Sequence, residues 1–463
     1  MIVVLVSAAL VSAGIVTLGA PLVPQIQLRF GLTELASQWS YTITLLVGAT
    51  AAPVLGRLAD GPRRRPAMGA VCLAVAAGCG LSATAGSYSV FLVGRAAQGL
   101  GVALVAMAIA TARDHLSGRR ATKVVALLSL TTALGAGSSY PLTTIVVQHQ
   151  GLPAAFGGAA VLAAVVAVTV MVGVPISLEG GRRPGLDVTG SVLLMTATAL
   201  GLVVISQGNR WGWVARETLV VGAASIVLAV SWVFWEIRAA HPLVELRLFR
   251  ERNVLAANVV ALLMGVSLFT TPVLLSRIAQ APAATGYGSG LSLTAVGLIM
   301  IPVAVGNIAG GALAVYAGEW LGPRMTLAGG GAVAGLGPMV LMAADGGVWR
   351  LLAGISLSAC GAGITFSTMT QLIVVSVAPG QTGSATSFNI VLRTVGGAVG
   401  SAATAAIIAA GPGPVPGYPS ATAFAAAFSV CAGTCVLSML VSAVLPLRVG
   451  PRLRSRTSPI PTD

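Results

Sequence analysis

The chain has 463 residues, of which 56% are hydrophobic and 8% are charged, whereas a soluble domain carries about 25% charged residues. So few charges cannot cover a water-facing surface, which excludes a soluble protein, and the many apolar residues exclude intrinsic disorder. The net charge of +14 comes from basic residues in short loops between apolar runs, a pattern typical of membrane topology rather than nucleic-acid binding.

Apolar runs of roughly 20 residues, enough to cross a bilayer, follow one another along almost the whole chain. Met1–Ala20 lacks the basic first part of a signal peptide, and we interpret it as the first membrane helix. The sequence predicts an all-α integral membrane protein with fourteen transmembrane helices. Their expected ranges are 2–24, 38–58, 67–86, 89–113, 121–147, 153–175, 187–206, 215–235, 254–276, 289–317, 323–344, 348–376, 383–410 and 421–446.

The basic residues predict the orientation of these helices. If the loop Asp60–Pro66 is cytoplasmic and the helices alternate, 19 of the 26 Lys and Arg residues lie on the cytoplasmic side and 5 on the other. Cytoplasmic loops of membrane proteins carry this excess of positive charge. We therefore expect both termini in the cytoplasm and a multi-pass protein of the cell membrane, in particular a bacterial inner membrane.

A weak internal repeat divides the chain. Gly56-Arg-Leu-Ala-Asp60 is followed by Gly61-Pro-Arg63, and Gly311-Ala-Leu-Ala314 is followed by Gly322-Pro-Arg324. Two related halves with a central path are the architecture of many secondary transporters. The repeat predicts a six-helix bundle over 1–176, two inserted helices with their flanking loops over 177–253, a second six-helix bundle over 254–446 and a cytoplasmic tail over 447–463.

The segment that begins at Gly56 is the most specific motif. Asp60 ends a membrane helix, and a cluster of arginines that includes Arg63 and Arg64 follows directly. Such a carboxylate can make charge-assisted hydrogen bonds in one conformation and release them in another. An ordinary basic loop would explain the arginines but not the Gly-x-Leu-Ala-Asp before them, so we interpret the segment as a conformational switch.

These motifs resemble the major facilitator superfamily, specifically its fourteen-helix drug:proton antiporter family. The resemblance covers almost the whole chain and rests on several segments together. They are Gly56–Arg65, Arg95-Ala-Ala-Gln98-Gly99, Leu186-Asp-Val-Thr-Gly190, Leu246-Arg-Leu-Phe-Arg250 and Asn389-Ile-Val-Leu-Arg393-Thr-Val-Gly-Gly397.

The resemblance implies a rocker-switch transporter that exports small, largely apolar compounds, drugs or natural products, in exchange for protons. It implies no enzyme activity and no cofactor; a monomer in the lipid bilayer suffices for this architecture. Asp60 would face the start of the helix near Thr382, and Asp114 would pair with the basic loop. An anion at a helix N-terminus is stabilised by about 0.3–2 kcal/mol.

Five residues are candidates for the transport path or for proton coupling. A buried arginine is costly unless it faces a cavity or a partner, which singles out Arg95, although snorkelling to the outer surface is the alternative. Gln98 lies one turn further along the same face. Tyr140 contacts substrate or only fills space. The last two candidates are Asn389 and Arg393, which belong to the motif in the thirteenth predicted helix.

The acidic residues set a limit on the substrate. None of the twelve falls in the middle of a predicted helix, and Ser12–Thr17 occupies the region in which relatives carry an aspartate. This favours neutral, zwitterionic or anionic compounds and leaves Asp60 or Asp114 as the proton carrier. We expect no metal site, because the cysteines and histidines show no ligand spacing. Uptake or facilitated diffusion of a metabolite is the alternative within transport; a membrane enzyme or receptor is a remote one.

Overall fold

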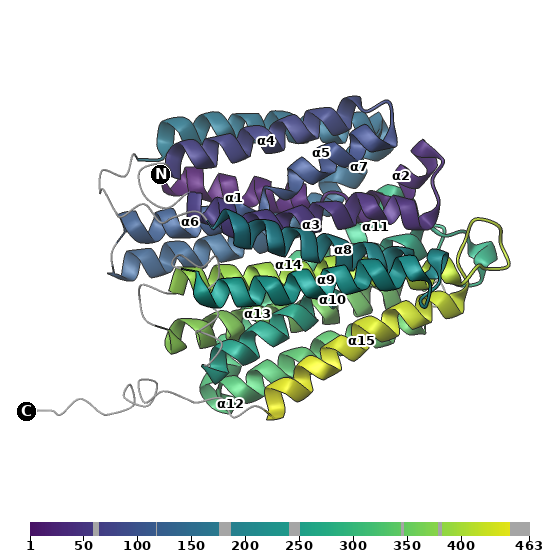
Figure 1. Ribbon diagram of the computed structural model, residues 1–463. Helices are drawn as coiled ribbons and strands as arrows, with labels where there is room; N and C mark the ends of the chain where they lie inside the picture. Colours follow the sequence, from purple (N-terminus) through teal and green to yellow (C-terminus); the bar gives the residue numbers. More distant parts are fainter. Residues whose placement is uncertain are drawn as a thin grey trace, which may run out of the picture.

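The computed structural model describes residues 1–58, 64–116, 118–175, 187–239, 251–343, 347–377 and 382–444. In these ranges the chain forms helices that run side by side along one direction (Figure 1). The start of α1 and the end of α15 lie at the same end of the bundle, on the left of Figure 1.

The first part of the chain forms the upper group of helices in Figure 1. Its first span is broken into three pieces near Leu18 and Gly19. The side chain of Ser87 caps the start of α5 by accepting a hydrogen bond from Val90 N. The elements are α1 (Ile2–Thr17), η1 (Ala20–Leu22), α2 (Val23–Phe30), α3 (Glu34–Leu58), α4 (Arg64–Thr84), α5 (Tyr88–Gly99), α6 (Val102–His115) and α7 (Gly118–Gly173).

The second part begins with a hairpin of two helices, α8 (Val188–Trp211) and α9 (Arg216–Arg238), joined by a short turn. The remaining helices are α10 (Arg252–Gln280), η3 (Ala283–Thr285), α11 (Leu293–Ile299), α12 (Ile301–Met342), α13 (Val348–Ser376), α14 (Thr382–Ala410) and α15 (Ala421–Val444). Most of them form the lower group in Figure 1, whereas the short α11 lies at the level of α3 and packs against α7.

Two helices are interrupted at a glycine. A straight helix of 56 residues, the length of α7, would be about 84 Å long, against a bilayer core of about 30 Å. The chain leaves the helical conformation at Gly151 (φ 81°) in α7 and at Gly322 (φ 77°) in α12. Only glycine adopts such angles readily, and Pro153 and Pro323 then suit the first turn of the next helical piece.

Eleven helical stretches of the described residues are long and apolar enough to cross a membrane. This confirms a multi-pass all-helical protein. Two of the stretches, Leu134–Gly173 and Leu293–Met342, contain the interruptions at Gly151 and Gly322, where the sequence predicts loops between separate helices. Most predicted helix ends agree with the structure within a few residues. The largest difference is the first span, predicted to end at 24, which continues through its break to Phe30.

The core lies between the two groups and within each of them. One buried cluster is built almost entirely from α1 to α7, and a second combines Tyr41 and Leu45 of α3 with Ala398 and Ala402 of α14. The hairpin of α8 and α9 lies in front of the bundle in Figure 1, and α8 packs against both α3 and α14. The line where α3 meets α14 is therefore one contact between the two halves, and α7 forms another with α11 and α12.

Candidate transport site and gate

The predicted switch lies mostly beyond the described structure. Asp60 and Arg63 lie outside the described residues, and so do the side-chain surroundings of Gly56, on α3, and of Asp114, on α6. Arg64 begins α4, and its side chain is 4% exposed. The predicted pairing of Asp60 and Asp114 with the arginine loop therefore stays a prediction.

Arg95 lies in the interior of the first half and is 0% exposed. Its Nε donates to the carbonyl oxygen of Ser40 at 3.0 Å, and its Nη1 donates to Gln98 Oε1. The guanidinium also lies over the ring of Phe156, 5.8 Å from the centroid. Nη2 is buried and has no hydrogen-bond partner. The Arg95 side chain therefore does not extend to the membrane surface, which was the alternative interpretation.

Gln98 is also fully buried and fixes the position of Arg95. While its Oε1 accepts from Arg95, its Nε2 donates to Ser82 Oγ at 3.0 Å and to the Gly78 carbonyl oxygen at 3.3 Å, both on α4. The Gln98 amide thus makes three hydrogen bonds, and together they hold the Arg95 guanidinium in one orientation. Sequence reasoning placed Arg95 and Gln98 on one face correctly but did not include Ser82.

A close helix crossing makes this arrangement possible. A methyl carbon added to Gly78 would lie 2.7 Å from the Gly94 carbonyl oxygen, and one added to Gly94 would lie 2.6 Å from the Gly78 carbonyl oxygen. Side chains at these positions would push α4 and α5 apart. The two glycines therefore bring Gln98 within reach of α4.

The second half repeats the crossing between α12 and α13. A methyl carbon on Gly337 would lie 2.4 Å from the Gly354 carbonyl oxygen, and one on Gly354 would lie 3.1 Å from that of Gly337. Ile355 follows Gly354 as Arg95 follows Gly94, and Ser358 is four residues beyond the glycine, as Gln98 is in α5. The second half thus carries an apolar side chain where the first half carries the arginine.

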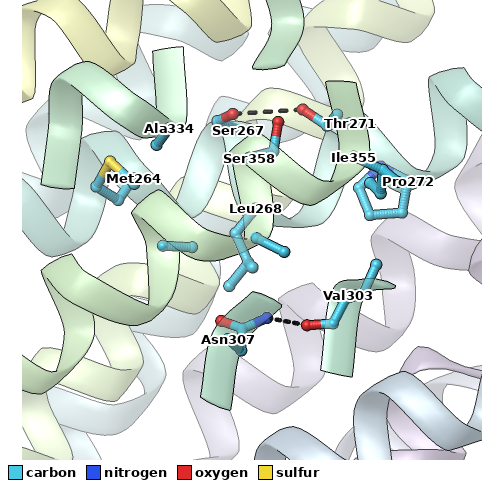
Figure 2. Close-up of a pocket in the computed structure, with 12 residues that line it drawn as sticks. Met264, Ser267, Leu268, Thr271, Pro272, Val303, Asn307, Ala334, Ile355 and Ser358 are labelled. Carbon is cyan, nitrogen blue, oxygen red and sulfur yellow. Dashed lines mark hydrogen bonds between the residues drawn. The ribbon is translucent and has the colours of Figure 1, made fainter. Parts of the chain in front are cut away.

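A cavity of about 20 Å³ lies beside Ile355, between α10, α12 and α13 (Figure 2). Its polar groups are few: Ser267 and Thr271 share a hydrogen bond of 3.3 Å, and Asn307 Nδ2 donates to the Val303 carbonyl oxygen. The Ser358 hydroxyl points toward the first pair in Figure 2 but has no hydrogen-bond partner. About one water molecule would fit in this volume.

The other predicted path residues lie apart from Arg95. Asn389, on α14, donates from Nδ2 to the Ala257 carbonyl oxygen at 2.9 Å and to Asn258 Oδ1 at 3.1 Å, which ties α14 to α10. The guanidinium of Arg393 lies 4.5 Å from the centroid of the Phe366 ring. Tyr140, on α7, is 4% exposed and belongs to the buried cluster shared by the two halves.

A set of hydrogen bonds that the sequence did not predict joins the two halves at one end. Ser401 Oγ on α14 accepts from Gln38 Nε2 at 2.9 Å and lies 2.8 Å from Thr42 Oγ1, and Arg277 Nη2 donates to Ser37 Oγ at 3.1 Å. We call these and two neighbouring contacts the seam lock. The other two are Gln25 Nε2 to Gln280 Oε1 at 3.2 Å and Ser276 Oγ to the Pro21 carbonyl oxygen at 3.1 Å.

The helix α3 connects the seam lock to the arginine. Ser37, Gln38 and Thr42 make the contacts with the second half. From the same turns, the Ser40 carbonyl oxygen accepts from Arg95 Nε, and Thr44 Oγ1 donates to the Arg95 carbonyl oxygen at 3.0 Å. Any movement of α3 relative to α5 must therefore change the surroundings of the guanidinium.

One feature of the sequence could have indicated the seam lock. The run Ser37-Gln38-Trp39-Ser40-Tyr41-Thr42 is unusually polar for the start of a membrane helix. Its hydroxyl and amide groups need partners in a bilayer. Ser401 could not be found in this way, because it lies among small residues that serve helix packing equally well.

Comparison with known protein families identifies the class of this protein. The sequence model of the Major Facilitator Superfamily matches residues 4–401, and the chain belongs to that family. It is a multi-pass membrane transporter of small molecules and not an enzyme.

Named bacterial relatives include efflux proteins. The chain is 26% identical over 390 residues to multidrug resistance protein Stp of Mycobacterium tuberculosis (81% of this chain, 69% of the relative). It is 28% identical over 387 residues to drug efflux pump JefA of the same species (81% and 73%). A third relative, a probable actinorhodin transporter of Streptomyces coelicolor, is 28% identical over 247 residues (50% and 41%).

Solved structures support the fold. A peptide transporter POT in complex with sulfate superposes with a TM-score of 0.69 at 16% identity, covering 98% of this chain and 94% of the other. The human organic anion transporter MFSD10 gives a TM-score of 0.63 at 16% identity (95% and 98%). At these identities the likeness concerns the fold alone.

Proposed function

We propose that the protein is a secondary active exporter of small, largely apolar compounds, including drugs or natural products, that works by alternating access. The observation that carries the proposal is the seam lock, a set of side-chain hydrogen bonds that joins the two halves at one end of the bundle. Relatives named multidrug resistance protein and drug efflux pump support export rather than uptake.

The proposed architecture has fourteen membrane helices, with α7 and α12 each contributing two through their breaks at Gly151 and Gly322. Bundles over 1–176 and 254–446 would move relative to each other, and the region 177–253 would contribute the added hairpin. With both termini in the cytoplasm, the seam lock is on the outer side, and the conformation described here is closed to the outside.

Proton antiport is the proposed energy source. In this account Asp60 locks the cytoplasmic side by bridging the arginine loop and the start of α14, and protonation weakens that contact by about 1–3 kcal/mol. Asp60→Asn is then expected to favour the inward-facing state and to slow export without abolishing substrate binding. The seam lock would act at the opposite end.

Transport into everted membrane vesicles tests the function. Apolar compounds should accumulate inside vesicles that contain the protein when the lumen is acidic, and a protonophore should abolish the accumulation; vesicles without the protein are the control. Equilibration that ignores the pH gradient would indicate a facilitative transporter. Expulsion from the lumen would indicate uptake in the cell, and either result would overturn the proposed export.

A further inference from the structure

The guanidinium of Arg95 is a buried positive charge without a negative partner. Its two hydrogen-bond acceptors, the Ser40 carbonyl oxygen and Gln98 Oε1, are both neutral. None of the carboxylates whose side chains the structure describes makes an ion pair with it. The Phe156 ring contributes a cation–π contact of about 0.5–2 kcal/mol but carries no net charge. A charge in this setting is costly, so its retention requires a reason.

The donor capacity of the side chain is also incomplete. A guanidinium has five N–H groups, and both of those on Nη2 lack an acceptor although the atom is buried. Ser40 on α3 and Gln98, which α4 anchors, hold the other two nitrogens. The orphaned donors therefore point in a fixed direction, as the recognition of a planar acid group requires.

The position that Nη2 faces is formed by the turn in the first span at Gly19. A methyl carbon added to Gly19 would lie 2.4 Å from Arg95 Nη2, so the absence of a side chain there leaves the nitrogen against bare backbone. Helix α1 ends at Thr17 and η1 begins at Ala20, and Leu18 and Gly19 between them keep helical backbone angles, so the span changes here from an α-helix to a 3₁₀ turn. An acid group that reaches Nη2 has to displace this turn.

The first span also lacks any acidic residue that could fill this space from within the chain. Its polar side chains near the break are hydroxyls: Thr17 Oγ1 lies 2.9 Å from Ser139 Oγ on α7, and Ser12 Oγ donates to the Gly101 carbonyl oxygen. Hydroxyls can assist in binding an acid group but cannot neutralise the arginine. Since none of the acidic side chains that the structure describes reaches the arginine, a counter-ion from outside the protein can take this place.

We propose that Arg95 Nη2, at the turn beside Gly19, is the recognition point for an anionic acid group, such as a carboxylate, on the exported compound. This inference rests on the proposed export function and assigns it a substrate class, apolar organic acids. Because Ser40 belongs to the same helix turns as Ser37 and Gln38 of the seam lock, release of that lock shifts α3 and opens the site toward the outside.

The test compares an acid with its methyl ester, in which a methyl group removes the charge. Naphthalene-2-carboxylate and its methyl ester present the same apolar rings with and without an anionic group. The thermal stability of the purified full chain in detergent, titrated with each compound, reports binding without requiring transport. The acid should raise the melting temperature of the wild type in a saturable manner, and the ester should require at least tenfold higher concentrations.

Two variants separate a role in binding from a role in folding. Arg95→Gln should remove the shift caused by the acid and leave the weak response to the ester, whereas Arg238→Gln, which changes an exposed arginine on α9, should keep the preference for the acid. If Arg95→Gln does not fold, Arg95→Lys retains the charge without the planar fork and should bind the acid at least tenfold more weakly. The comparison on the wild type stands in either case.

Several results would overturn the proposal: equal binding of acid and ester by the wild type, no shift with the acid, or an acid shift that persists in Arg95→Gln. Sodium chloride that produces the same shift and competes with the acid would assign the site to a free inorganic anion instead. Acid binding together with vesicles that show no gradient-driven accumulation would refute the proposed export while leaving the anion site intact.

Discussion

The two halves of the molecule use the same helix crossing for different purposes. Between α4 and α5 the glycine pair Gly78 and Gly94 supports a polar site, in which Arg95 is hydrogen-bonded and fully buried. Between α12 and α13 the pair Gly337 and Gly354 supports an apolar contact, with Ile355 beside a small cavity. The crossing is therefore a structural device common to both halves, and the residue that follows it decides the chemistry.

The comparison also shows what a buried arginine requires. The first half supplies a carbonyl oxygen on α3, an anchored glutamine and an aromatic ring. In the second half the residue at the position of Gln98 is Ser358, whose hydroxyl has no partner. An arginine at position 355 would lack this support, and three expected effects follow from this difference.

The largest effect is expected from Ile355→Arg. The variant places a charge in an apolar region that offers about 20 Å³ of free space and few acceptors. Burial of an unpaired charge destabilises a protein by on the order of 4 kcal/mol or more. We expect almost no folded protein in the membrane, measured by size-exclusion chromatography of detergent extracts. A normal yield would show that the two crossings differ less than the structure indicates.

Arg95→Ile, which makes the first half resemble the second, should act on function more than on folding. Replacing a buried charge by a hydrophobic residue is often neutral for stability. We expect folded protein of near wild-type melting temperature with export reduced tenfold to a hundredfold, on the order of a coupling of 1–3 kcal/mol. Vesicle transport with matched protein amounts provides the measurement, and retained export would make Arg95 a packing residue.

The smallest effect is expected from Ile355→Val, which removes one methyl group beside the existing cavity. Such a change costs about 0.5–1.5 kcal/mol in a packed interior. Ile355 is 2% exposed and makes no polar contact, so the melting temperature should fall slightly while export is unchanged. A selective loss of export in this variant would instead place the second-half cavity on the transport path.

The sequence was sufficient for the membrane class, most helix ends and the pairing of two polar residues, Arg95 and Gln98, on one helix face. Helices in a bilayer must satisfy their backbone internally, so apolar length alone locates them. Arg95 and Gln98 were found because polar residues in such runs are rare. Their partners were not, since the Ser40 carbonyl oxygen belongs to the backbone and Ser82 resembles any small packing residue.

The contact between the halves is the part that sequence could not predict. Gln38 and Ser401 are separated by 363 positions, and only the packing of α3 against α14 brings them together. Arg277 lies just beyond the predicted helix over 254–276, whereas in the structure it belongs to α10, is 8% exposed and donates to Ser37. Short-range patterns carry no information on pairs of this kind.

The central claim is that the seam lock holds the two halves closed at one end, and a distance measurement across the lock is the most direct test. Nitroxide labels at Thr33 and Ala284, two exposed residues at the lock end of opposite halves, are attached in a background without the five native cysteines. Pulsed electron spin resonance then compares the wild type with Gln38→Ala combined with Ser401→Ala. Each lost hydrogen bond is worth about 0.5–1.5 kcal/mol, so the double variant should gain a clearly larger population at long distance. An unchanged distance distribution would contradict the claim that these side chains hold the two halves closed.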